Sequence, residues 1–232
     1  MMLETTLLTL LLTLQPWHED AKRETPGARE ARLGVVAQSV ARAADLLTCK
    51  GSPDGDKCER KWRGSRETLA VMLVNLGWWE SRYALHVHQN RCRVLIGECD
   101  AGRARSPWQL QISRQVEWRR WMQIAGTSRA ATNEAAHAAA DVFAMAHARC
   151  KNMEGAIAMY ATGKRCKWKR AADRMAHYRK LLARFEELRD AEKTYPADWI
   201  ADAFREAVEL NKRSWRYVVR ILERWRTEGR GD

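Results

Sequence analysis

One glutamate of the chain lies among residues that would deprive a charge of water. Glu80 follows two tryptophans in the run GWWESRY (77–83), and it ends an apolar stripe at helical spacing made by Leu69, Leu73 and Leu76. A carboxyl group with little access to water has a raised pKa, which general acid catalysis near neutral pH requires. The alternative is an ordinary acid at a frayed helix end, and the stripe alone favours neither interpretation.

The helix that would position Glu80 has a well-defined predicted start. Ser65 has the side chain of an N-cap, and Glu67 lies near the positive end of the helix dipole. Few prolines and few alternating runs predict a mainly α fold for the whole chain. Further helices are expected over about 30–48, 113–125, 133–149, 153–162, 168–190, 197–210 and 214–228.

The segment 84–111 is expected to be irregular, because glycines and a proline interrupt it. Its short apolar run, Val94–Ile96, is predicted to form a small hairpin strand. A second break is expected at RDAEKTYPAD (189–198), which is typical of a linker. The predicted organisation is a leader or poorly defined segment over 1–32, a helical domain over 33–190, and a linker with a helical pair over 191–232.

The chain carries a formal net charge of +12, which implies attraction to a polyanion. Nucleic acid, anionic lipid and an acidic cell-wall polymer all fit. Tryptophan beside basic residues, as in CKWKR (166–170), suits stacking on a base or on a sugar ring, and equally suits a solvated basic face. Charge and aromatic content therefore do not distinguish nucleic acid, anionic lipid and a cell-wall polymer as the binding partner.

Six cysteines close three local loops in the sequence, which predicts three disulfides and an oxidising destination. The predicted pairs are Cys49 with Cys58, Cys92 with Cys99, and Cys150 with Cys166. The rival is a zinc site made by His86, His88 and Cys92, but no CxxC repeat or HExxH motif supports it. We expect no metal and no cofactor.

The amino-terminal leucine-threonine run is too short for a membrane-spanning helix. It also lacks a basic region and carries Glu4 where a signal peptide would be positive. The cysteines nevertheless predict an extracytoplasmic location. Release through a membrane lesion, as in phage lysis, would need no signal peptide.

Three short blocks follow one another along the chain: WESRY (79–83), ARSPWQLQ (104–111) and AIAMYATG (156–163). In this order they resemble the signatures of lytic transglycosylases and goose-type lysozymes, and the resemblance covers about 33–190. It implies a lysozyme-like helical domain with a small irregular or β-hairpin region. It also implies cleavage of the glycan strand of peptidoglycan, with Glu80 as the catalytic acid.

The resemblance also assigns substrate-binding residues. It places Ser81 and Gln109 in the sugar cleft and Tyr160 in support of the Glu80 carboxyl group. Two residues depart from the pattern: Ser106 stands where the group usually has glycine, and Ala161 where it usually has asparagine.

A second carboxylate is not evident in the sequence. Glu98 and Asp100 are candidates to position water, and each is also a plausible solvated turn residue. In the lytic enzymes the substrate's own hydroxyl attacks, so no second carboxylate is needed. Hydrolysis and the lytic reaction both stay open.

The tail, 195–229, resembles the end of a DnaD-type replication domain, in which Tyr217, Ile221, Leu222 and Trp225 carry the pattern. The resemblance implies DNA binding. On a helical wheel Arg216, Arg220 and Arg224 share the face opposite the apolar one, where they would contact phosphates or form a solvated face. The alternative function is thus a DNA-binding, replication-associated protein whose lysozyme-like domain is inactive.

Overall fold

A computed structural model describes residues 2–14, 23–48, 61–210 and 215–230. The prediction of a mainly α fold is confirmed. The helices of eight residues or more are α1 (Met2–Thr13), α2 (Pro26–Thr48), α3 (Arg66–Ser81), α7 (Arg129–Cys150), α8 (Met153–Thr162), α9 (Ala171–Thr194), α10 (Ala197–Glu209) and α11 (Trp215–Glu228). The chain divides into two compact units, Met1–Leu182 (unit 1) and Ala183–Asp232 (unit 2).

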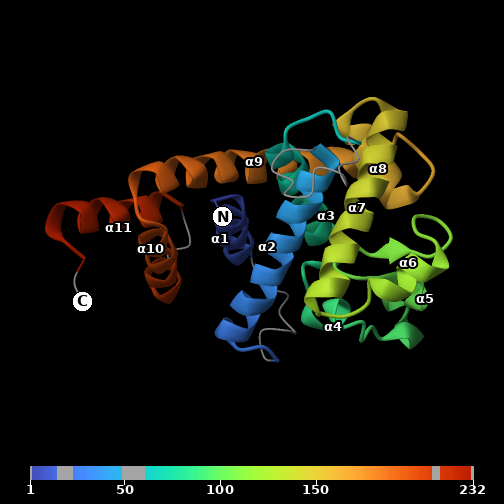
Figure 1. Cartoon of the computed structure of the whole chain (residues 1–232), viewed down its shortest axis with the longest axis horizontal. Helices are drawn as coiled ribbons and strands as arrows, with labels where there is room; N and C mark the ends of the chain where they lie inside the picture. Colours follow the sequence, from blue (N-terminus) through green and yellow to red (C-terminus); the bar gives the residue numbers. More distant parts are fainter. Residues whose placement is uncertain (1, 15–22, 49–60, 211–214, 231–232) are drawn as a thin grey trace. The chain divides into compact units, whose positions relative to one another are not determined.

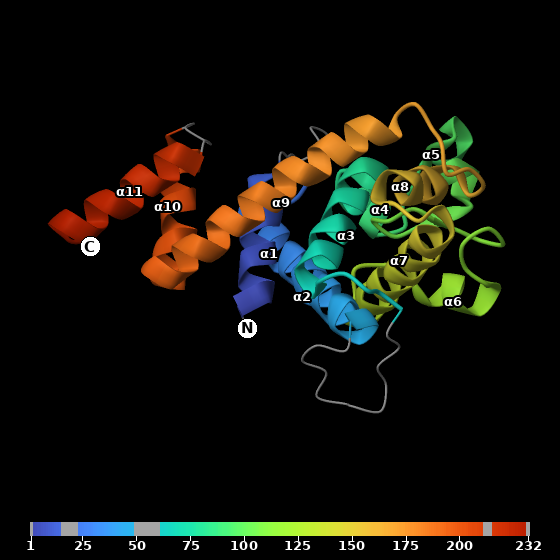
Figure 2. The same ribbon diagram turned by 90° about the horizontal axis from the view of Figure 1, so that it is seen from above.

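Small residues bring the central helices of unit 1 together. The buried face of α7 is rich in alanine, and α7 packs along α2 on one side and along α8 on the other (Figures 1 and 2). Alanine leaves room for close approach of two helix backbones. The α3 helix also packs on α2, and it buries the predicted stripe of Leu69, Leu73 and Leu76 completely. This packing fixes the direction in which α3 delivers Glu80.

The amino-terminal segment contains a packed helix. Leu7, Leu10 and Leu11 of α1 are buried, and α1 packs on α2. The leucines of this segment therefore contribute to the core of unit 1. Among the residues that the structure describes, no helix combines the length and apolar character needed to cross a membrane.

The predicted strand at Val94–Ile96 is wrong. These residues form a 3₁₀ turn, η3, and all three are exposed. The two-stranded antiparallel sheet lies further on, where β1 (Ala104–Arg105) pairs with β2 (Leu110–Gln111), with Ala104 opposite Gln111. The turn between β1 and β2 contains Trp108, whose side chain is fully buried. The hairpin is therefore anchored to the core by Trp108, whereas the side chains of Val94–Ile96 are exposed.

Two other boundaries differ from the prediction. The helix expected at 113–125 is the shorter α6 (Trp118–Gln123), because the Glu117 side chain caps its start by accepting from the backbone amides of Arg119 and Arg120. The expected linker after residue 188 is helical as far as Thr194, since Leu188 and Ala191 are buried. The compact units divide at Leu182, before the predicted domain boundary.

Two of the predicted disulfides are formed, Cys92–Cys99 and Cys150–Cys166. The predicted pair of Cys49 and Cys58 lies outside the described residues. The short helices α4 (Leu85–His88) and α5 (Glu98–Gly102) surround the first disulfide. The Cys92–Cys99 bond closes a loop in the irregular region between α3 and the hairpin, and the Cys150–Cys166 bond joins the end of α7 to the segment after α8.

Candidate active site

The three blocks that carry the resemblance meet at one cleft of unit 1, which has a volume of about 310 Å³. Glu80 comes from the last turn of α3, Gln109 from the hairpin turn, and Tyr160 and Ala161 from α8. The cleft is also lined by Asp100, Ala104, Gln111, Arg114, Gln115, Thr162 and Gly163. Two carboxyl groups, those of Glu80 and Asp100, thus share the cleft with one arginine and with amide and hydroxyl groups that suit a hydroxyl-rich ligand.

Helix capping fixes Glu80 at the cleft. Arg82 ends α3 in the left-handed conformation, at φ 54°, and its amide donates to the carbonyl oxygen of Trp78. The predicted N-cap is confirmed, because Ser65 accepts from the amide of Thr68. At the other end the buried Ser81 hydroxyl donates to the Gly77 carbonyl and accepts from the Tyr83 amide, at 3.1 Å each. Ser81 therefore holds the helix end, and it is absent from the cleft lining.

The charge of Glu80 is balanced by a residue that sequence analysis missed. Arg174, in the first turn of α9, forms an ion pair with the Glu80 carboxylate. The Arg174 guanidinium lies 5.5 Å from the ring centre of Trp79 and 4.9 Å from that of Trp168. Burial raises the pKa of Glu80, and the charge and hydrogen bond of Arg174 oppose the rise. No local pattern in the sequence linked Arg174 to Glu80.

Tyr160 positions the hairpin. Its hydroxyl donates to the carbonyl oxygen of Trp108 at 3.0 Å, and the Trp108 indole donates to the carbonyl oxygen of Leu73 at 2.9 Å. This chain of bonds joins α8, the hairpin turn and α3, the three elements that line the cleft. The hydrogen bond of Tyr160 goes to Trp108 and not to Glu80, which gives Tyr160 a positioning role.

The hairpin turn has backbone strain next to the cleft. Ser106 has φ 67° and Gln109 has φ 47°, a region that favours glycine. Ser106 thus occupies a glycine-type conformation at the position where the resembled enzymes usually have glycine. The Gln109 side chain donates to the Ser106 carbonyl at 3.1 Å and faces the cleft. Ala161 also lines the cleft, with no polar group where the pattern has asparagine.

The two candidate water-positioning carboxylates are separated by the structure. Asp100 lies in a left-handed turn, with φ 53°, 52° and 54° at Cys99, Asp100 and Ala101, and it lines the cleft. Its carboxylate is 3.3 Å from the Arg103 guanidinium. Glu98 is absent from the lining and binds Arg93, whose side-chain and backbone hydrogen bonds lower the pKa of Glu98. Of these two carboxylates, Asp100 lines the cleft with Glu80 and Glu98 does not.

The rival zinc site is not assembled. Cys92 is joined to Cys99, and the His88 ring is buried between the Thr132 hydroxyl at 3.1 Å and the Arg32 guanidinium at 3.4 Å. Burial and the charge of Arg32 lower the pKa of His88 to about 3. Across the described parts of the chain, no group of His, Cys, Asp and Glu has the arrangement of a metal site.

Unit 2 contains the end of α9 with α10 and α11. The apolar face predicted for α11 is confirmed, since Val218, Ile221, Leu222 and Trp225 are buried. Arg216, Arg220 and Arg224 are all exposed on the other face. Arg224 differs from the other two because its guanidinium donates to the Glu206 carboxylate at 2.8 Å.

Comparison with known families finds a match for the tail. A family model described as replication initiation and membrane attachment matches residues 183–230. The match confirms the resemblance of the tail to a DnaD-type domain, and it begins earlier than predicted, in the second half of α9. It gives no support for a lysozyme-like domain. Comparison with curated proteins and with solved structures finds no match.

Proposed function

We propose that unit 1 cleaves the glycan strand of peptidoglycan, with Glu80 as the general acid and then as the general base. The observation that carries the proposal is the position of Glu80, a carboxyl group with a raised pKa in a cleft lined by Gln109, Gln111 and Tyr160. The two disulfides support an extracytoplasmic location, which such a substrate requires.

The chemistry follows from the protonation state of Glu80. A protonated Glu80 delivers its proton to the glycosidic oxygen while positive charge develops at the sugar carbon, and the C–O bond breaks. The resulting carboxylate then accepts a proton from the attacking hydroxyl group. If that group belongs to water, the reaction is hydrolysis and Asp100 is placed to orient the water. If it belongs to the sugar, an anhydro product forms and Asp100 has no chemical role.

The first test is the clearing of purified cell walls by the full chain, followed as a loss of turbidity. We expect clearing under non-reducing conditions, because the Cys92–Cys99 bond supports the turn that carries Asp100. Walls that stay turbid at every pH between about 4 and 8, the range in which a perturbed glutamate titrates, would sink the proposal.

Replacing Arg174 by methionine should shift the pH dependence of this reaction. The positive charge of Arg174 lowers the pKa of Glu80, so its loss raises that pKa further. Because the acid must be protonated to act, the alkaline limb of the pH–rate profile should move to higher pH. The matched control is Arg82→Met: the Arg82 guanidinium lies 4.5 Å from the Trp78 ring centre, and the ion pair of Glu80 is made with Arg174 instead. If the alkaline limb of the pH–rate profile lay at the same pH in both variants, the proposed effect of Arg174 on Glu80 would be refuted.

A second candidate function belongs to unit 2, and the match to the replication-initiation family favours it. In this function the tail binds DNA, and Arg216 and Arg220 contact phosphates. Both are exposed and have no ion-pair partner among the described residues, whereas Arg224 is neutralised by Glu206.

Substituting alanine for Arg216 and Arg220 should weaken binding of the full chain to a labelled duplex. Each lost phosphate contact should flatten the dependence of log affinity on log salt by about 0.9. Arg224→Ala is the matched control and should change the slope less. A slope that the double substitution leaves unaltered would show that the tail makes no phosphate contact through this face.

A further inference from the structure

The turn that precedes the cleft exposes three consecutive apolar side chains. The exposed fractions are 47% for Val94, 102% for Leu95 and 68% for Ile96. Single exposed apolar residues are ordinary on a protein surface, but an uninterrupted exposed run is unusual unless it serves an interaction. The side chain of Leu95 is fully exposed and therefore does not contribute to the packing of the fold.

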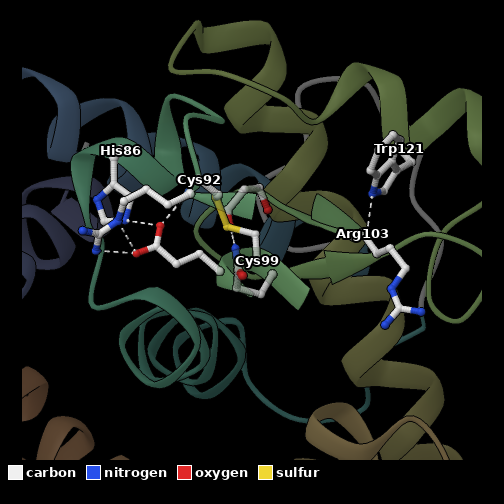
Figure 3. The surroundings of a disulfide bond; sticks show 9 residues. His86, Cys92, Cys99, Arg103 and Trp121 are labelled. Carbon is white, nitrogen blue, oxygen red and sulfur yellow. Dashed lines mark hydrogen bonds and ion pairs between the residues drawn. A yellow bond between two sulfur atoms is a disulfide. The ribbon is translucent and has the colours of Figure 1, made fainter. Parts of the chain in front are cut away.

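The base of this turn is closed, which holds the apolar tip outward. The Cys92–Cys99 bond joins its two ends (Figure 3). Cys99 is buried in a small cluster with Ala84, Val87 and Ala104. Across the same base the Glu98 carboxylate accepts from the Arg93 amide at 2.7 Å and from the Arg93 guanidinium at 2.8 Å. The disulfide and the Arg93–Glu98 bonds therefore constrain the loop and keep its apolar tip, Val94–Ile96, exposed.

Basic residues flank the tip. Residues 89–105 contain four arginines against one glutamate and one aspartate. Arg91, Arg93 and Arg103 are exposed. Arg93 pairs with Glu98 and Arg103 with Asp100, whereas Arg91 has no side-chain partner among the described residues, so the flank keeps a net positive charge. Cations beside an apolar tip complement a bilayer surface, in which anionic headgroups lie above the acyl chains. A nucleic acid would account for the arginines but not for an exposed Leu95.

We infer that the loop closed by Cys92 and Cys99 is a membrane-contact element, which inserts Leu95 and its two neighbours into the interface of an anionic bilayer. The inference does not depend on glycan cleavage. The loop continues into α5 and β1, which contribute Asp100 and Ala104 to the cleft wall. Insertion would hold the mouth of the cleft near the bilayer surface.

The test is sedimentation of the full chain with vesicles of phosphatidylcholine containing about one quarter phosphatidylglycerol. The variant is Leu95→Ser with Ile96→Ser, and we expect its partition into vesicles to fall by about tenfold or more, because two apolar side chains no longer leave water. Met145→Ser is the matched control: Met145 is 60% exposed on α7, outside the loop, and its loss should leave partition unchanged.

Salt separates insertion from charge attraction. At about 0.5 M NaCl, where screening is strong, the wild-type chain should keep part of its binding and the double variant should lose it. Wild-type binding that disappears entirely in high salt would overturn the inference. So would an absence of vesicle binding, or binding that the double variant retains, as a lipid contact through the tail would produce. Clearing of purified walls, which contain no bilayer, should be equal in both proteins.

Discussion

Replacing Glu80 by glutamine should reduce wall cleavage about a thousandfold, since general acid catalysis contributes about 10² to 10⁴ in rate. Glutamine has nearly the shape of glutamate but cannot deliver the proton. Glu98→Gln is the matched control, because Glu98 is a carboxylate of the same region that binds Arg93 and is absent from the cleft lining. It should keep nearly full activity.

The fold of the Glu80→Gln protein needs its own control, because the substitution leaves the charge of the largely buried Arg174 without its partner. The double variant Glu80→Gln, Arg174→Met removes both charges and should be folded and inactive. Circular dichroism and the urea midpoint measure the fold, and turbidity measures the rate. Activity in the double variant above a few per cent of wild type would exclude Glu80 as the acid.

Replacing Gly77 by alanine should lower the free energy of unfolding by about 3 kcal/mol. Two effects contribute to this loss: the overpacking of a buried site and the loss of a buried hydrogen bond. A Cβ at this position would lie 2.5 Å from the hydroxyl oxygen of Tyr83. That hydroxyl is buried and donates to the Val74 carbonyl at 3.0 Å, so the ring cannot move without breaking its bond. Because Gly77 is one turn before Glu80, wall cleavage should fall as well.

Gly34→Ala is the matched control for this prediction. Gly34 lies inside α2, and a Cβ there would meet nothing within 4 Å. Alanine should therefore raise the unfolding free energy by about 0.5–1 kcal/mol through helix propensity. Urea unfolding of both variants measures the contrast. A Gly77→Ala protein as stable as wild type would show that Tyr83 has room to move.

Local patterns in the sequence predicted those features of the site that depend on interactions between residues close together in the chain. The stripe ending at Glu80 and the N-cap Ser65 depend on helix periodicity and on one hydrogen bond, both readable within a few residues. The same holds for the disulfides Cys92–Cys99 and Cys150–Cys166, which close short loops.

Contacts between distant segments were not predictable in this way. Arg174 is far from Glu80 in sequence, and no local pattern links them. The bond from Tyr160 to Trp108 depends on how α8 packs beside the hairpin. Val94–Ile96 were misassigned because an apolar run normally reports a buried strand, and here a closed loop keeps it exposed.

The most direct test of the central claim is mass spectrometry of the soluble products released from purified peptidoglycan by wild-type and Glu80→Gln proteins treated side by side. The account predicts muropeptides from the wild type and none above background from the variant. Anhydro ends would assign the lytic reaction, and reducing ends would assign hydrolysis. Failure of the wild-type chain to release any muropeptide, or equal release by both proteins, would contradict the assignment of Glu80 as the acid of a glycan-cleaving site.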